Sequence, residues 1–140
     1  MRPMDTSSFD YSSAVVAHLQ YFGIAIVATA LFVGIYIAIT PHREFALIRQ
    51  GNIAAATSLG GALMGYIIPL AKAVSQSESV GDMLVWSGVA LVAQLVAYGV
   101  TRLILPTLSN DVHEGRVASG IFLAAMSVGT GLLNAAAMTE

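Results

Sequence analysis

The chain contains no cysteine and few charged residues, and both shortages limit what kind of protein it can be. Without a thiol, its 140 residues can form no disulfide, no thiolate metal site and no cysteine nucleophile. Asp, Glu, Lys and Arg together make up only 10% of the chain, whereas soluble domains carry about a quarter. So few charges cannot cover the surface of a soluble globule of this size. The composition therefore predicts a membrane protein.

Other absences narrow the function. The formal net charge of -2 leaves no basic surface for nucleic acid, and a hydrophobic content of 56% excludes a disordered chain. The three histidines, His18, His42 and His113, lie in separate segments without His-x-x-x-His spacing or a carboxylate cluster, so we expect no metal site. There is no serine nucleophile elbow and no phosphate-binding glycine loop. We therefore expect no cofactor and no enzymatic activity.

Four long runs of the chain contain no Asp, Glu, Lys or Arg. These runs are residues 11–42, 50–71, 83–101 and 117–139. About 20 apolar residues in a helix cross the hydrocarbon core, and the runs lack the alternation of a membrane strand. We predict an all-α, polytopic fold with four membrane-spanning helices at about 21–39, 52–73, 83–105 and 117–138. Residues 1–20 form an N-terminal tail, whose part 11–20 approaches the first span, and residues 21–140 form the membrane domain.

A cleaved signal peptide is the alternative interpretation of the first span. A signal peptide needs a basic N-terminal region, a short apolar core and a small-residue cleavage site. Here Arg2 is the one basic residue before the span, Asp5 and Asp10 balance it, and the apolar run is long. These features favour a retained helix.

The positions of Lys and Arg predict the orientation. Arg43 and Arg49 lie between the first two spans, and Arg102 and Arg116 flank the connection between the last two, whereas the other side has only Arg2 and Lys72. Because Lys and Arg are enriched in cytoplasmic loops, both of these connectors should be cytoplasmic. Both termini and the loop 76–81 should then be periplasmic, in a bacterial inner membrane.

The second half of the chain resembles the first when the two are aligned from Gly51 and Gly115. This register superposes Gly51 on Gly115, Ile53 on Val117, Ala54 on Ala118, Leu59 on Leu123 and Gly65 on Gly129. The pattern predicts two tandem hairpins, at about 21–73 and 83–138, related by a pseudo-twofold axis along the membrane normal. Coincidence among small residues is the alternative.

The connector between the first two spans has the signals of a short helix that lies in the membrane interface. Its informative residues are Thr40, Pro41, Arg43, Glu44, Arg49, Gly51 and Asn52. We expect Thr40 to cap this helix ahead of Pro41, with Glu44 in its first turn and Arg49 in its last. Gly51 suits a left-handed helix end, and Asn52 suits the cap of the second span. A docking surface for a cytoplasmic partner is the alternative role.

Small residues recur in the second and fourth spans at the spacing that allows close helix packing. We predict packing roles for Thr57, Gly61, Gly65, Gly120 and Gly131. Pro69 removes a backbone hydrogen bond and crowds the carbonyl four residues earlier. It should kink the second span, either as a matter of shape or as part of a gate.

Three polar residues inside the predicted spans raise a functional question. Gln94 lies near the middle of the third span with Tyr98 one turn later, and Asn134 lies late in the fourth. A polar side chain at this depth needs a partner. Hydrogen bonding between helices is the first interpretation, and a polar path through an oligomer is the second. Arg102 should extend to the cytoplasmic headgroups.

The chain resembles the YjfL-like family of small bacterial inner-membrane proteins. The resemblance covers residues 20–138 and is carried by T-P-H-R-E-F-A-L-I-R-Q-G-N-I-A-A-A, L-G-G-A-L-M-G, I-I-P-L, D-M-L-V-W-S-G-V-A and G-L-L-N-A-A. It implies four spans built from two copies of a hairpin. Members of the family tend to be encoded near PspA-like membrane-remodelling proteins and glutathionylspermidine-synthase-like ligases, so the resemblance also implies an envelope-stress or membrane-maintenance setting. It implies no defined activity.

Two functions follow from these expectations. The first is a structural or interaction protein that forms homo-oligomers and offers its cytoplasmic connectors to a partner such as a PspA-like envelope-stress protein. The second is an oligomeric channel or permease for ions or small solutes, since four short helices enclose little on their own.

Overall fold

The computed structural model describes residues 11–40 and 44–138, and all regular structure within these ranges is helical. Four helices are long and apolar enough to cross a membrane: α1 (Tyr11–Ile39), α3 (Ile53–Gln76), α4 (Val80–Ile104) and α6 (Val117–Ala137). Two short helices, α2 (Glu44–Arg49) and α5 (Leu108–His113), lie in the connections. The prediction of an all-α protein with four candidate spans is confirmed.

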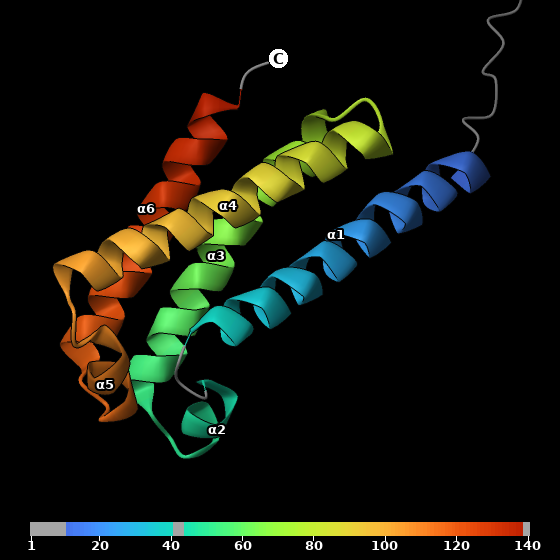
Figure 1. Ribbon diagram of the computed structural model, residues 1–140. Coiled ribbons are helices and arrows are strands. Elements are labelled where there is room, and N and C mark those ends of the chain that lie inside the picture. Colours follow the sequence, from blue (N-terminus) through green and yellow to red (C-terminus); the bar gives the residue numbers. More distant parts are fainter. Residues whose placement is uncertain (1–10, 41–43, 139–140) are drawn as a thin grey trace, which may run out of the picture.

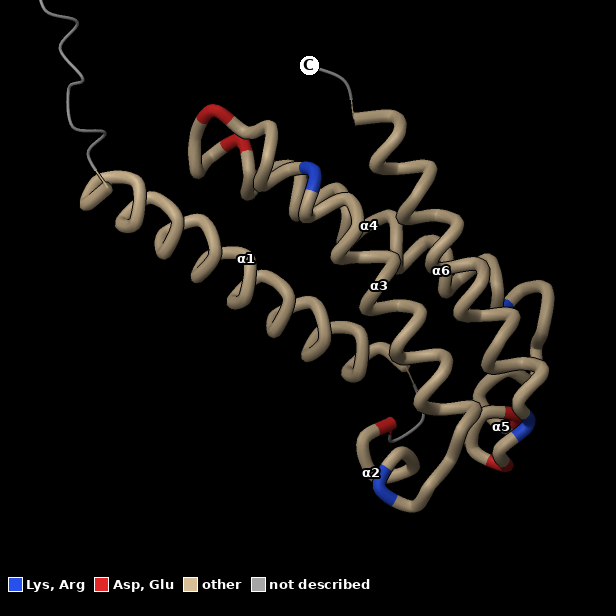
Figure 2. The backbone as a smooth tube through the Cα atoms, turned by 180° about the vertical axis from the view of Figure 1, so that it is seen from behind, with Lys and Arg blue, Asp and Glu red and all other residues tan. Residues whose placement is uncertain are grey.

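The helices run alternately up and down (Figure 1). The start of α1, the α3–α4 connection and the end of α6 lie at one end of the bundle, which we call the terminal end. The short helices α2 and α5 lie at the opposite end, which we call the connector end. Charged residues gather at these two ends and leave the helices between them almost free of charge (Figure 2). This distribution is the one that a bilayer requires.

Two elements differ from the sequence-based expectation. α1 is continuous from Tyr11, so residues 11–20 extend the first helix and are not a separate approach segment. No proline or glycine interrupts them, and nothing in their sequence ends a helix. The short helix α5 is the second difference. Counted in residues, α5 begins as far after the start of α2 as α6 begins after the start of α3. The alignment of the two halves of the sequence could therefore have predicted α5 from the expected helix between the first two spans.

Local capping explains where α3 and α4 begin. Asn52 accepts a hydrogen bond from the Ala55 amide at 2.9 Å, and the Ser79 hydroxyl accepts one from the Asp82 amide at 3.1 Å. Each satisfies an amide that the first helical turn leaves unpaired. The turn before α3 and the turn before α6 each contain a glycine with positive φ, Gly51 at 84° and Gly115 at 78°. Glycine adopts this conformation without steric cost.

The core of the bundle is the contact between α3 and α6, which we call the α3–α6 seam. It is formed by small residues: Ala54, Gly61 and Gly65 of α3, and Gly120, Ala124, Ser127 and Gly131 of α6. A Cβ added to Gly61 would collide with Ala124, and one added to Gly120 would lie 2.6 Å from the Ala54 oxygen. The two backbones are therefore close enough that side chains larger than these do not fit. Thr57 lies off this line, half-buried, and its hydroxyl donates to the Ile53 carbonyl within α3.

Pro69 lies inside α3 and is buried, and the helix continues past it to Gln76. A proline at this position leaves the Gly65 carbonyl without its usual helical donor. That oxygen faces α6, because a Cβ added to Gly131 would collide with it. The absence of a side chain at Gly131 thus accommodates the carbonyl that Pro69 exposes.

We predict that Gly61→Ala lowers the thermal stability of the detergent-solubilised protein, since its Cβ would meet the α6 backbone. Overpacking of this kind costs on the order of 1–3 kcal/mol. Gly60→Ala is the matched control, because a Cβ at Gly60 has nothing within 4 Å and the change in helix propensity is the same. Thermal unfolding followed by circular dichroism measures the difference. Equal melting temperatures for the two variants would contradict the proposed seam.

Candidate functional site

The predicted intramembrane residue Gln94 lies where three helices meet. Its side chain is 1% exposed, and its Nε2 donates to the Ser127 carbonyl of α6 at 3.0 Å. A Cβ added to Gly65 of α3 would lie 2.7 Å from the same nitrogen. The amide therefore joins α4 to the α3–α6 seam, as expected of a polar side chain that bonds between helices.

Other buried hydroxyl groups bond within their own helices. Ser87 donates to the Met83 carbonyl at 2.7 Å and Thr101 donates to the Ala97 carbonyl at 2.7 Å. Such bonds back to the preceding turn satisfy a hydroxyl group without any ligand. These two residues therefore need no functional explanation.

Three polar atoms near Gln94 and along α6 have no hydrogen-bond partner among the described residues. They are Gln94 Oε1, Ser127 Oγ and Asn134 Nδ2. Unpaired polar atoms are costly in a medium of low dielectric constant. They are enclosed by the packed helices rather than exposed on the outer surface, which favours a packing role for the three residues over a polar lining.

An aromatic cluster attaches α1 to the rest of the bundle. Phe32 stacks on Tyr66 of α3 with ring centroids 4.3 Å apart, and Tyr36 meets the edge of Tyr98 of α4 at 5.8 Å. Sequence reasoning selected Tyr98 but not its partners. Phe32 and Tyr36 are four residues apart, the helical spacing of one face, and this signal could have identified them.

Glu44 lies in the first turn of α2 but is fully buried. Its carboxylate interacts electrostatically with the Tyr36 and Tyr98 side chains. We expected this connector helix to present its polar residues to the interface. Instead its first acidic residue faces the aromatic cluster, while Phe45 is half exposed and Arg49 is exposed in the last turn.

Thr40 bonds backward into α1, and the amides ahead of it that it was expected to cap belong to residues outside the described ranges. Its hydroxyl donates to the Tyr36 and Ile37 carbonyls at 3.0 and 3.3 Å, so it satisfies the last turn of α1. A threonine can bond to the turn before it as readily as to amides ahead of it. The predictions for Pro41 and Arg43 concern residues outside the described ranges.

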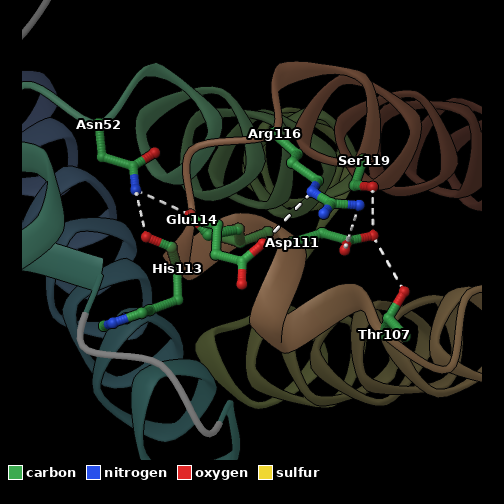
Figure 3. A network of polar contacts seen from close by, with 8 residues as sticks. Asn52, Thr107, Asp111, His113, Glu114, Arg116 and Ser119 are labelled. Atoms are coloured by element: carbon green, nitrogen blue, oxygen red, sulfur yellow. Dashed lines mark hydrogen bonds and ion pairs between the residues drawn. The ribbon is translucent and has the colours of Figure 1, made fainter.

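Asn52 links the two connectors (Figure 3). While its oxygen caps α3, its Nδ2 donates to the Val112 carbonyl at 2.7 Å and to the His113 carbonyl at 3.3 Å. These carbonyls belong to the last turn of α5, which lacks the regular amide donors of a continuing helix, although the Val112 carbonyl also accepts from the Gly115 amide at 3.1 Å. One side chain therefore serves the start of α3 and the end of α5, and sequence reasoning had found only the first of these roles.

A second polar network holds α5 against the start of α6 (Figure 3). The Asp111 carboxylate accepts hydrogen bonds from Thr107 at 3.1 Å and from Ser119 at 2.8 Å, and Arg116 lies 3.7 Å away. Arg116 also approaches Glu114 at 3.3 Å. Because both side chains of that last pair are largely exposed, we assign the ordering of α5 to the buried Asp111 rather than to this ion pair.

At the terminal end, Lys72 of α3 donates to the Ala135 carbonyl of α6 at 2.6 Å. A cation at the C-terminus of a helix satisfies an orphan carbonyl and complements the helix dipole. Sequence reasoning treated Lys72 only as an orientation signal. Nothing local in the sequence indicates that its amine reaches across to α6.

We predict that Gln94→Met destabilises the protein by about 0.6–2 kcal/mol, the range for hydrogen bonds between membrane helices. Methionine keeps the length of the side chain but cannot donate to Ser127. Leu95→Met, at the partly buried neighbouring position, is the control. Unfolding of both variants in detergent would be compared with that of the parent protein. An unchanged stability for Gln94→Met would show that the bond contributes nothing.

We also predict that Asn52→Asp and Asn52→Ala affect different helices. Aspartate keeps the oxygen that caps α3 but loses both N–H donors to α5, so amide hydrogen exchange should rise in α5 alone. Alanine loses both functions, so exchange should rise in α5 and in the first turn of α3. Hydrogen exchange read by mass spectrometry separates the two patterns. Identical patterns would argue against the double role of Asn52.

Comparisons with known proteins agree with a membrane location. The DUF350 family, described as a domain of unknown function, matches residues 10–138. The chain is 38% identical over 126 residues to the UPF0719 inner membrane protein YjfL of Escherichia coli strain K12, which covers 90% of this chain and 96% of that protein. It is 23% identical over 128 residues to the UPF0719 transmembrane protein YshE of Bacillus subtilis strain 168, with the same coverage. No solved structure matches.

Proposed function

We propose that this chain, which belongs to the DUF350 family of inner-membrane proteins, is a non-enzymatic structural protein. In this proposal it self-associates in the inner membrane and offers its connector end to a partner. The membership agrees with the resemblance found in the sequence. The observation that carries the proposal is a groove between α1 and α3.

The groove has a volume of about 570 Å³ and lies between the first half of α1 and the last half of α3. Its walls are mainly apolar and mix alanines with larger side chains. The alanines are Ala14, Ala17 and Ala25 of α1 and Ala71 of α3, and the larger side chains of the α3 wall are Ile67, Leu70 and Val74. α1 diverges from the bundle toward the terminal end (Figure 1). Its buried residues, Phe32 and Tyr36, belong to its last turns. The first half of this helix is therefore held by few contacts with its own bundle.

A helix of a second copy fits this groove best. Helices associate in lipid where small residues allow their backbones to approach, and the alanines of the groove provide such positions, three of them on α1 and one on α3. Each copy also brings a loosely held α1, so two copies related by a twofold axis could each place α1 in the groove of the other. A twofold contact of this kind closes on itself and needs no further subunits.

The connector end is the proposed contact surface for a partner in the cytoplasm. Arg49, Arg102 and Arg116 are exposed there, which supports the cytoplasmic orientation of this end and the periplasmic orientation of the termini. The half-exposed Phe45 of α2 provides an apolar contact beside Arg49. A PspA-like protein of the envelope-stress response is the partner that the family resemblance suggests.

The arrangement also supports the proposal that the chain is a tandem repeat. The offset from the start of α2 to the start of α5 equals the offset from the start of α3 to the start of α6. The two glycines with positive φ, Gly51 and Gly115, follow the same spacing. Two hairpins that meet through equivalent helices would give the pseudo-twofold arrangement expected from the sequence.

We predict that Ala71→Cys, labelled in native membranes with a benzophenone maleimide, yields a covalent dimer on illumination, because the label would lie against α1 of the second copy. The parent chain has no cysteine, so one substitution provides a unique reporter in the groove. Leu133→Cys is the matched control, because Leu133 of α6 is exposed and also lies toward the terminal end but outside the groove. Denaturing gel electrophoresis measures the dimer. Efficient crosslinking of Leu133→Cys, or none of Ala71→Cys, would count against self-association through the groove.

An oligomeric channel or permease is the second candidate function. The unpartnered Gln94 Oε1, Ser127 Oγ and Asn134 Nδ2 are the observation that favours it, since they could bind a polar solute if the helices separated. The close packing of the α3–α6 seam opposes such an opening. Ion and solute flux through reconstituted liposomes distinguishes the candidates, and the structural role requires no flux above that of empty liposomes.

A further inference from the structure

A cavity at the terminal end is separate from the groove and from the intramembrane polar residues. It has a volume of about 450 Å³ and lies where α3 ends and α4 begins, with Met138 closing one side. Four of its lining residues have side chains suited to recognition: Ser77, Glu78, Asp82 and Trp86. The volume is within the range of small-molecule sites.

The cavity carries two carboxylates that no cation of the described chain neutralises. Neither Glu78 nor Asp82 forms an ion pair within residues 11–40 and 44–138. Lys72, the cation of α3 nearest this end, donates to the Ala135 carbonyl of α6. The Asp82 amide is engaged by the Ser79 hydroxyl, which holds the first turn of α4 at the wall of the cavity. The cavity is therefore acidic and selects against anions.

Two further side chains indicate what kind of cation fits. Trp86 follows Asp82 by four residues, so the indole and the carboxylate lie on the same face of α4. An indole ring attracts an organic cation through its π face. Ser77 is partly buried, and its Oγ is enclosed and has no hydrogen-bond partner among the described residues. This lining residue therefore leaves a polar atom unsatisfied unless its side chain turns into the cavity and accepts a hydrogen bond there.

We propose that this cavity binds a primary ammonium group carried on a small organic molecule. The ammonium would donate hydrogen bonds to the Glu78 and Asp82 carboxylates and to Ser77 Oγ, and its carbon chain would pack on Trp86 and Met138. A bare divalent ion suits the site less well. Indole is not a metal ligand, and the described residues contain no group of three His, Cys, Asp or Glu that could hold a metal. The ammonium can come from a soluble amine or from an aminophospholipid headgroup at the membrane surface.

The fluorescence of Trp86 tests the proposal directly, because Trp86 is the single tryptophan of the chain. The full-length protein in phosphatidylcholine nanodiscs would be titrated with propylammonium chloride, with sodium chloride at the same ionic strength as the control. In a second arm, nanodiscs that contain phosphatidylethanolamine would be compared with nanodiscs that do not. A saturable change with propylammonium identifies soluble amines as sufficient. A change only with phosphatidylethanolamine identifies the lipid headgroup.

Substitutions separate binding at this site from a general effect on the membrane. Glu78→Gln and Asp82→Asn should each weaken the response at least about tenfold while circular dichroism shows unchanged helicity. Glu114→Gln removes an exposed carboxylate at the connector end and should leave the response unchanged. The proposal is overturned if the parent protein responds to neither source of ammonium. It is equally overturned if the response persists undiminished in both Glu78→Gln and Asp82→Asn.

Discussion

The contact of α3 with α6 is the constraint on which the rest of the structure depends. In lipid, apolar side chains gain little from leaving one apolar environment for another, so helices associate through close backbone packing and polar bonds. Glycine and alanine at the α3–α6 seam allow this approach. The other long helices are then arranged around this pair. Gln94 bonds α4 to it, and the stack of Phe32 on Tyr66 holds α1.

The two ends of the bundle are built differently. At the connector end, Asn52 and Asp111 use buried or partly buried hydrogen bonds to hold short helices against the spans. The terminal end has fewer such bonds, an open cavity and a diverging α1. A rigid end with exposed arginines and a more open end with exposed carboxylates suit contacts of different kinds. On the proposals above, the connector end would contact a cytoplasmic partner, whereas the terminal end carries both the groove for a second copy and the cavity for a small molecule.

Much of the fold was predictable because the bilayer imposes a strong pattern on composition. Runs without charge located all four candidate spans. The ends of the predicted spans differ by only a few residues from the ends of the helices, except at the start of α1, where the predicted span begins at residue 21 and the helix at Tyr11. The glycines of the seam were also recognisable from their spacing. Contacts between residues distant in sequence were not predictable. Nothing near Lys72 indicates that its amine reaches Ala135. Glu44 was expected at the membrane interface, and its burial could not be predicted because the side chains that it faces, Tyr36 and Tyr98, belong to other helices.

The length of α1 has a mechanical consequence. Its 29 residues make a rod of about 44 Å, whereas the hydrocarbon layer is about 30 Å thick. A helix longer than its layer relieves the mismatch by tilting. The fully buried residues of α1, Phe32 and Tyr36, lie near its connector end, and its first half diverges from the bundle. A thinner membrane thus favours greater inclination of α1 and a wider opening beside α3. If two copies join through this groove as proposed, their association would depend on the local thickness of the lipid around them.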